Sequence, residues 1–130
     1  MSTEDNIATI RRAFEAINRG NVEGFMSGFA PTCIFHDKPS GGITTYEGAR
    51  QGAVSSFKNF PDLYITLEDM IVQGEKVVVR YTYSATHPPT GKKVTWTGIS
   101  ILHFVDGKVV EDWANTDMLS FMQQIAAIPT

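Results

Sequence analysis

Hydrophobic residues in the first half of the chain recur every three or four positions, which is the spacing of an amphipathic helix. The first such stretch contains Ile7, Ile10 and Phe14. A serine or threonine before it can act as the N-cap, and a glycine after it fits the C′ position. The predicted elements of this half are a helix over Ser2–Arg19, a shorter helix from Asn21 up to Pro31, a strand over Cys33–Asp37, a Pro-Ser-Gly-Gly loop and a helix over Tyr46–Asn59.

After Pro61 the period changes to two, which is typical of strands. Turn residues divide this half into strands that begin near Leu63 and continue over Lys76–Thr86, Val94–Phe104 and Val109–Asp117, followed by a short helix or loosely packed tail from Met118 to Ile128. Helices followed by an antiparallel meander predict an α+β fold. Long twisted strands covered by N-terminal helices on one face form a curved, cone-shaped sheet, or α+β barrel, whose mouth can hold a ligand.

The pairing of the last two strands decides which side chains share a face of the sheet. A two-residue turn at Asp106-Gly107 would place His103 and Asp117 on opposite faces, whereas a three-residue loop closed by a glycine bulge would place them on one face. We predict the bulged pairing, with His103 beside Val109, because Val-Asp-Gly-Lys supplies a type I turn followed by glycine. The inner face then carries Ile99, Ile101, His103, Val109, Glu111, Trp113, Asn115 and Asp117.

In this pairing the outer face of the sheet is apolar, since Trp96, Leu102 and Phe104 would lie there. A monomer rarely exposes so large an apolar patch. We therefore expect a homodimer that buries these side chains through its sheet, with a contact of about 1,600 Å² in total.

Composition narrows the classes of protein. With 130 residues the chain has the length of a single domain, here 1–130, and its net charge of −3 and scattered basic residues argue against a nucleic-acid partner. Cys33 has no second cysteine to pair with. The chain shows no secretory signal and no apolar run that could span a bilayer, so we expect a cytoplasmic protein without a membrane partner.

Candidate chemistry rests on a few ionisable residues in apolar strands, because motifs for nucleotide binding, serine hydrolysis and zinc are absent and no metal is expected. Asp117 follows Trp113 by four residues, and a carboxyl group against aromatic walls has a raised pKa suited to proton transfer. Equally, Asp117 could cap the helix that starts at Met118. His103 and His36 could hydrogen-bond a substrate oxygen, or could be structural.

Several stretches, in order along nearly the whole chain, resemble the SnoaL-like polyketide cyclases of the nuclear-transport-factor-2-like superfamily. They are RRAFEAINRGNVEGF, FAPTCIFHDKPSG, YEGARQ, FPDLYITLEDMIVQGEKVVVRYTYSATH, PPTGKKV and DGKVVEDW followed by Asp117. The resemblance implies a dimeric cone-shaped fold and an intramolecular aldol ring closure without cofactor, with Asp117 as general acid/base assisted by His103. The chain departs from the family at His103, where many relatives carry arginine, and at Asp112, where many carry histidine.

The sequence therefore predicts a cofactor-independent enzyme that acts on a hydrophobic small molecule with a carbonyl group. Aldol cyclisation is the favoured reaction; isomerisation, dehydration, epoxide hydrolysis and binding without catalysis are the alternatives. Asp117, His103 and His36 are the predicted catalytic residues. The predicted substrate-binding residues are Phe14, Met26, Phe35, Tyr81, Tyr83, Ile101, Trp113 and Asn115.

Overall fold

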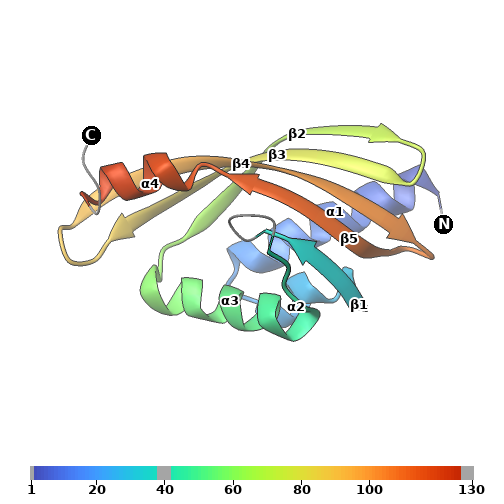
Figure 1. The fold of residues 1–130 in the computed structure, drawn as a ribbon, viewed down its shortest axis with the longest axis horizontal. Coiled ribbons are helices and arrows are strands. Elements are labelled where there is room, and N and C mark those ends of the chain that lie inside the picture. The colour runs from blue at the N-terminus through green and yellow to red at the C-terminus, as the bar shows by residue number, and fades with distance from the viewer. Residues whose placement is uncertain (1, 38–41, 127–130) are drawn as a thin grey trace.

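The computed structural model describes residues 2–37 and 42–126, so most of the predicted Pro-Ser-Gly-Gly loop and the end of the predicted tail lie outside the described residues. Three helices lie on one side of a curved sheet, and a fourth follows its last strand (Figure 1). The helices are α1 (Thr3–Asn18), α2 (Val22–Met26), α3 (Tyr46–Asn59) and α4 (Met118–Gln124), and the strands are β1 (Phe29–His36), β2 (Tyr64–Gln73), β3 (Lys76–His87), β4 (Lys92–Val105) and β5 (Lys108–Thr116).

The five strands have the order β1-β5-β4-β3-β2. Strands β2 to β5 form the predicted antiparallel meander, while β1 joins the sheet parallel to β5. The sheet is therefore mixed, and it curves without closing (Figure 1). This arrangement confirms the predicted α+β fold with a cone-like sheet covered by helices.

Local sequence signals define the ends of α1. The Ser2 side chain accepts a hydrogen bond from the Asp5 backbone N–H, and the Asp5 carboxylate accepts one from the Ser2 backbone N–H, which makes a capping box. Gly20, just past the helix, has a φ of 74°, a conformation that favours glycine. The predicted boundaries of α3 are also confirmed. Among the described residues, no helix is long and apolar enough to cross a membrane.

The prediction was wrong for the segment before Pro31. Helix α2 ends at Met26, and Phe29 already begins β1, so Pro31 lies within a strand. Proline is tolerated there because β1 lies at the edge of the sheet, where one side of the strand needs no partner. Phe29 and Cys33 are buried in the core from this strand.

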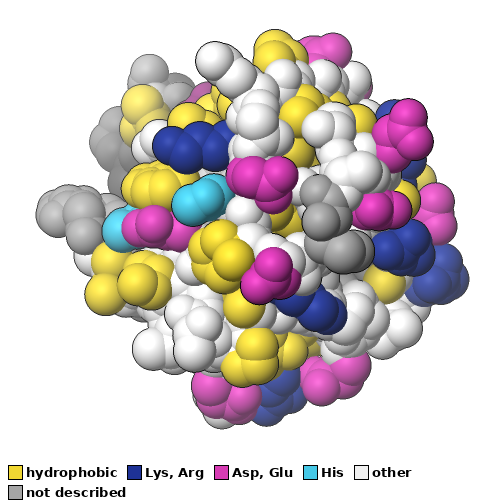
Figure 2. Space-filling view, turned by 90° about the vertical axis from the view of Figure 1, so that its right-hand side faces the viewer, with side chains coloured by type: hydrophobic (Ala, Val, Ile, Leu, Met, Phe, Trp, Pro, Cys, Tyr) yellow, Lys and Arg dark blue, Asp and Glu magenta, His cyan; other side chains and the backbone are white. Residues whose placement is uncertain are grey.

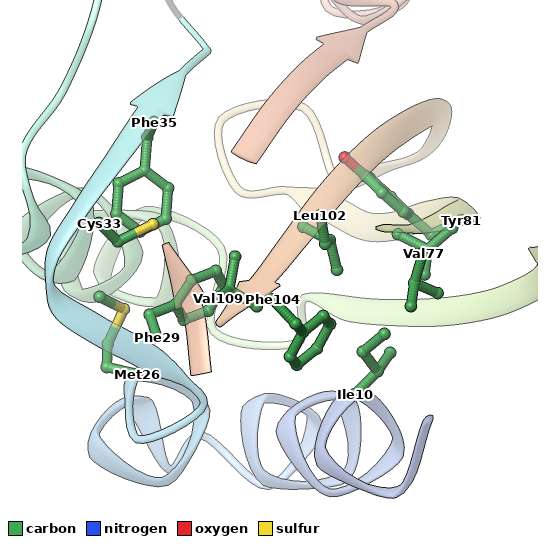
Figure 3. Packing of buried hydrophobic residues seen from close by; sticks show 11 residues of the cluster. Ile10, Met26, Phe29, Cys33, Phe35, Val77, Tyr81, Leu102, Phe104 and Val109 are labelled. Carbon is green, nitrogen blue, oxygen red and sulfur yellow. The ribbon is translucent and has the colours of Figure 1, made fainter. Parts of the chain in front are cut away.

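The hydrophobic core lies between the sheet and the helices. Met26, Val77 and Phe104 are fully buried, and Ile10 of α1 points towards Phe104 of β4 (Figure 3). The surface at one end of the molecule is mixed: Figure 2 shows charged side chains of both signs between hydrophobic ones there.

Two side-chain amides pair with strand backbone as a neighbouring strand would. Asn18 of α1 donates to the Ile65 carbonyl and accepts from the Ile65 N–H, both at 2.8 Å. Gln124 of α4 makes the same pair of hydrogen bonds with Thr95. These contacts fasten α1 to β2 and α4 to β4.

The turn between β4 and β5 differs from the prediction. Val105 pairs with Lys108 around a two-residue turn, in which Asp106 (φ 50°) and Gly107 (φ 80°) are both left-handed. The register shifts just beyond the turn, between Phe104 and His103. His103 therefore pairs with Glu111, and the prediction that it lies beside Val109 was wrong.

The bulge nevertheless groups the strand side chains as predicted, with two exceptions. Val109 pairs with Phe104 on the other face, and Asp117 lies beyond the end of β5 as the N-cap of α4. This shared face is the outer one, because Ile99 and Ile101 are 45% and 40% exposed, whereas Leu102 and Phe104 are 6% and 0% exposed. Inside and outside of the last hairpin are thus the reverse of the prediction. Pairing fixes which residues share a face, but contact with the helices decides which face is buried. The pairs on the outer face are His103 with Glu111, Ile101 with Trp113 and Ile99 with Asn115.

Candidate active site

Among the polar side chains on the inner, largely apolar face of the sheet are Asp112 and Ser100. Asp112 of β5 stands in register with Leu102 of β4 and Phe35 of β1, and both neighbours are buried. Ser100, which is 4% exposed, precedes Leu102 by two residues and so shares its face. A carboxyl group and a hydroxyl group are thus held in the interior under the helices.

Tyr81 of β3 reaches this polar pair across β4. Its hydroxyl lies 2.7 Å from the Ser100 hydroxyl. The ring passes directly over Gly98, where an added Cβ would lie 2.4 Å from the Tyr81 Cε2 atom. Gly98 is therefore needed for the ring to cross the strand. Tyr83 lies beside it, with the two ring centroids 5.4 Å apart in an edge-to-face arrangement.

Burial raises the pKa of Asp112 to about 7, and the negative charge of Asp37 raises it as well. The Ser100 hydroxyl and His36 act in the opposite direction. The Asp112 Oδ1 atom is buried and has no hydrogen-bond partner among the described residues. A carboxyl group with a pKa near neutrality can both accept and return a proton at physiological pH, which is the property of a general acid/base.

The two phenols beside Asp112 are held in their protonated form. Burial raises the pKa of both Tyr81 and Tyr83, and the charge of Asp112 adds to this effect. A buried, protonated phenol can donate a hydrogen bond to an oxygen that gains negative charge during a reaction.

A second buried side chain lacks a partner in the same interior. Asn6 of α1 is 1% exposed, and neither its amide nitrogen nor its carbonyl oxygen has a hydrogen-bond partner among the described residues. It lies one helical turn before Ile10, on the stripe of α1 that faces the sheet. Unpartnered buried groups such as Asn6 and the Asp112 Oδ1 are where ordered water or a ligand oxygen would bind.

The predicted catalytic residues lie elsewhere. Asp117 follows the end of β5 and is exposed, and its Oδ1 accepts a hydrogen bond from the Ser120 N–H at 3.0 Å as the N-cap of α4. His103 lies on the outer face and pairs with Glu111. Because Glu111 is six residues before Asp117, the two predicted catalytic residues are about 20 Å apart along the strand direction. His36 stacks on Trp113 with 5.4 Å between ring centroids, and its Nε2 lies 2.7 Å from the Glu111 Oε2. The structure thus brings His36 near Glu111 but does not bring Asp117 to either histidine.

The predicted substrate-binding residues divide between the two faces. Five of them pack in the interior, namely Phe14, Met26, Phe35, Tyr81 and Tyr83. The other three lie on the outer face, namely Ile101, Trp113 and Asn115.

Asp112 and Ser100 were missed by the sequence reasoning, although the sequence held a signal for them. Along β4 the even-numbered positions include Val94, Trp96, Leu102 and Phe104, which are more apolar than the odd-numbered ones. That stripe marks the inner face, and Ser100 is the polar member within it. Asp112 belongs to the same inner face because it pairs with Leu102.

Other candidate ligands and nucleophiles are few. Burial raises the pKa of the Cys33 thiol to about 12, so it stays protonated and is a weak nucleophile. In the part of the chain that the structure describes, no three His, Cys, Asp or Glu side chains are arranged to hold a metal ion.

Two hollows open on the surface, one of about 290 Å³ between α1, α2 and the β4–β5 turn and one of about 500 Å³ between α1 and β2. Neither is lined by Asp112 or Ser100. The chemistry suggested by Asp112 therefore belongs to the interior and not to these hollows.

A curved, unclosed sheet with helices over its inner face is the α+β cone of the nuclear-transport-factor-2-like proteins. Within this class, the profile of the SnoaL-like polyketide cyclases matches residues 8–125, and the chain belongs to that family. No curated protein matches the chain.

Solved structures with the same fold include proteins named as a hydroxylase and as polyketide cyclases. AclR of Streptomyces galilaeus, a proposed hydroxylase, is 25% identical with a TM-score of 0.90, over 99% of this chain and 89% of AclR. IdmH of Streptomyces antibioticus, a proposed polyketide cyclase, is 26% identical with a TM-score of 0.84, over 93% and 98%. A proposed polyketide cyclase of Bacillus cereus is 29% identical with a TM-score of 0.84, over 98% and 87%.

Proposed function

We propose that this protein is an enzyme that closes a ring by an aldol reaction within a hydrophobic, carbonyl-bearing molecule, with Asp112 as general acid/base. The observation that carries the proposal is the buried Oδ1 atom of Asp112, unpartnered among the described residues, in a carboxyl group whose pKa is raised to about 7. Membership of the SnoaL-like polyketide cyclase family supports the reaction class.

In the proposed reaction the ionised Asp112 accepts a proton from a carbon next to a carbonyl group. The resulting enolate oxygen accepts a hydrogen bond from the phenol of Tyr81 or Tyr83. The enolate carbon then bonds to a second carbonyl carbon of the same molecule, whose π electrons move onto its oxygen. Asp112 returns its proton to this oxygen, so a hydroxyl group forms and the carboxylate is restored.

The interior favours Asp112 over Asp117 for this role. Asp117 is exposed, and its Oδ1 already accepts the Ser120 N–H, so burial does not prepare this carboxyl group for proton transfer. His36 and His103 face the opposite side of the sheet. We therefore place the acid/base role on Asp112 and a structural role on Asp117.

The two aspartates provide matched variants for a test. Asp112→Asn keeps the shape but removes the titrating group, so turnover of a linear poly-β-ketone should fall by roughly 10²–10⁴. Asp117→Asn should keep both turnover and melting temperature, because asparagine caps a helix nearly as well as aspartate. The wild-type rate should rise with pH through about 7 as Asp112 ionises.

Undiminished turnover in a folded Asp112→Asn variant would remove Asp112 from the mechanism. A selective loss in Asp117→Asn at unchanged melting temperature would return the role to Asp117. Isomerisation is the nearest rival reaction, because it uses the same proton transfer to and from a carboxyl group. The carbon NMR spectrum of the product separates the two, since only cyclisation forms a new carbon–carbon bond.

We also propose that the chain forms a homodimer through the outer face of its sheet. Ile71, Val78, Ile101 and Trp113 form one row across four strands. Ile71 is 66% exposed and Ile101 is 40% exposed, which is unusual for so continuous an apolar row. The prediction that Trp96, Leu102 and Phe104 form the dimer contact was wrong, because these side chains are buried inside the protein.

Sedimentation velocity at micromolar concentration tests this assembly. The wild type should be a dimer, and Ile101→Glu should be a monomer, because a buried unpaired charge opposes association. Val54→Glu, at an exposed apolar position of α3, is the control and should remain a dimer. A monomeric wild type would contradict the proposal.

A further inference from the structure

A groove of about 500 Å³ runs between α1 and the edge strand β2. Phe14 and Tyr64 supply aromatic surface to it, and Arg11 and Arg19 lie along its α1 side. Its volume lies within the range of small-molecule sites. It shares no lining residue with the polar pair Ser100 and Asp112.

The walls of this groove are fixed by contacts on the protein side. The Asn18 amide makes two hydrogen bonds of 2.8 Å with the Ile65 backbone and so joins α1 to β2. The Phe14 ring packs against Tyr81 with 6.0 Å between centroids, so it is supported from the interior. A ligand would therefore meet a formed surface, which limits the entropy lost on binding.

The rim of the groove carries positive charge without a partner. Arg11 and Glu15 of α1 lie on one side of the helix, and Arg19, its C-cap, follows four residues after Glu15. Neither arginine side chain has an ion pair or hydrogen bond with another described residue, whereas Arg50 pairs with Glu47 and Arg80 with Asp69. Two arginines and one glutamate give the rim a charge of +1 on a chain of net charge −3.

We propose that this groove binds a flat amphipathic anion of the aromatic carboxylate class. The carboxylate lies at Arg11 and Arg19, since a guanidinium group donates two parallel hydrogen bonds to a carboxylate. The ring lies against Phe14 and Tyr64, and the Tyr64 side chain is 51% exposed and available for contact. The site does not depend on the reaction proposed for Asp112.

The same contacts argue against a peptide strand as the occupant. Peptides that bind a sheet edge need its free backbone groups. Both backbone groups of Ile65 are already bonded to Asn18, in the middle of the groove.

Titration with 2-naphthoate and the neutral 2-naphthamide, followed by protein NMR, tests this site. We expect shifts at Phe14 and Tyr64 and roughly tenfold tighter binding of the carboxylate, as an ion-assisted hydrogen bond implies. The double variant Arg11→Gln/Arg19→Gln should lose this preference. Arg12→Gln is the matched control and should keep it, because Arg12 lines the other hollow. Glu15→Gln should tighten binding about twofold by removing a like charge.

Equal affinity for the two probes, an unchanged preference in the double variant, or no saturable binding at millimolar concentration would overturn the proposal. Shifts confined to Ser100 and Asp112 would overturn it too, by placing the ligand in the interior. Asp112→Asn should leave 2-naphthoate affinity unchanged. Failure of the groove therefore remains distinguishable from failure of the function proposed for Asp112.

Discussion

Two neighbouring carboxyl groups on β5 face opposite sides of the sheet and have different surroundings. Glu111 points outward, 32% exposed, with its Oε2 atom 2.7 Å from the His36 Nε2. Asp112 points inward, where its Oδ1 has no partner and burial raises its pKa to about 7. The pKa of a carboxyl group in this hairpin thus depends on the face it occupies. On the inner face Asp112 is shielded from water and has no ion-pair partner among the described residues, whereas on the outer face Glu111 is partly exposed and paired with His36.

Apolar residues differ between the faces in the same way. Leu102 and Ile101 are neighbours on β4, of nearly equal size, yet Leu102 is 6% exposed and Ile101 is 40% exposed. The inner residue contributes to the stability of the monomer, and the outer one is available for contact with another molecule.

The largest expected effect comes from truncating these two residues. Leu102→Ala should lower the free energy of unfolding by about 2–5 kcal/mol, because it leaves a cavity in the core. Ile101→Ala should cost less than about 1 kcal/mol, since water can fill the space. Urea unfolding at a protein concentration where both variants are monomeric measures the difference. Equal losses would contradict the assignment of inner and outer faces.

The next effect concerns the charge of Asp112. Its raised pKa means that the folded state binds a proton more tightly than the unfolded state. The stability this provides is complete below pH 4 and is lost as the pH rises to about 7. Asp112→Asn removes this loss, so the variant should be about 4 kcal/mol more stable than wild type at pH 8 and similar to it at pH 4. Thermal unfolding across this range measures it, and a difference that does not depend on pH would contradict the buried, unpartnered state.

The smallest effect is expected for the outer pair. His36 and Glu111 are each about one third exposed, so their coupling energy should be below about 1 kcal/mol and should fall further with added salt. A double-mutant cycle with His36→Ala and Glu111→Ala measures this energy. Measured at a protein concentration where the chain is monomeric, a value above about 2 kcal/mol would contradict the exposure of this pair.

The sequence was a good guide wherever neighbouring residues set the structure. The helices α1 and α3 were predicted because their caps and apolar spacing are local, and the strands of the meander because alternation is local. It was a poor guide at Pro31, where the position of β1 at the sheet edge, decided by distant β5, allows proline in a strand. The roles predicted for Asp117 and His103 assumed that their face of the last hairpin was the inner one. The structure places His103 on the outer face, and the catalytic roles themselves stay predictions.

The sequence by itself determined the α+β class, the order of the elements, the family and, apart from Val109, which residues of β4 and β5 share a face. Only the tertiary structure decided which face became the interior, because that depends on where α1, α2 and β1 pack against the sheet. That choice left the Oδ1 atom of Asp112 buried on the face of Ser100 and Tyr81 and placed His103 on the outer face. It also left Asp117 at the start of α4, where its side chain accepts a hydrogen bond from a backbone N–H that has no partner within the helix.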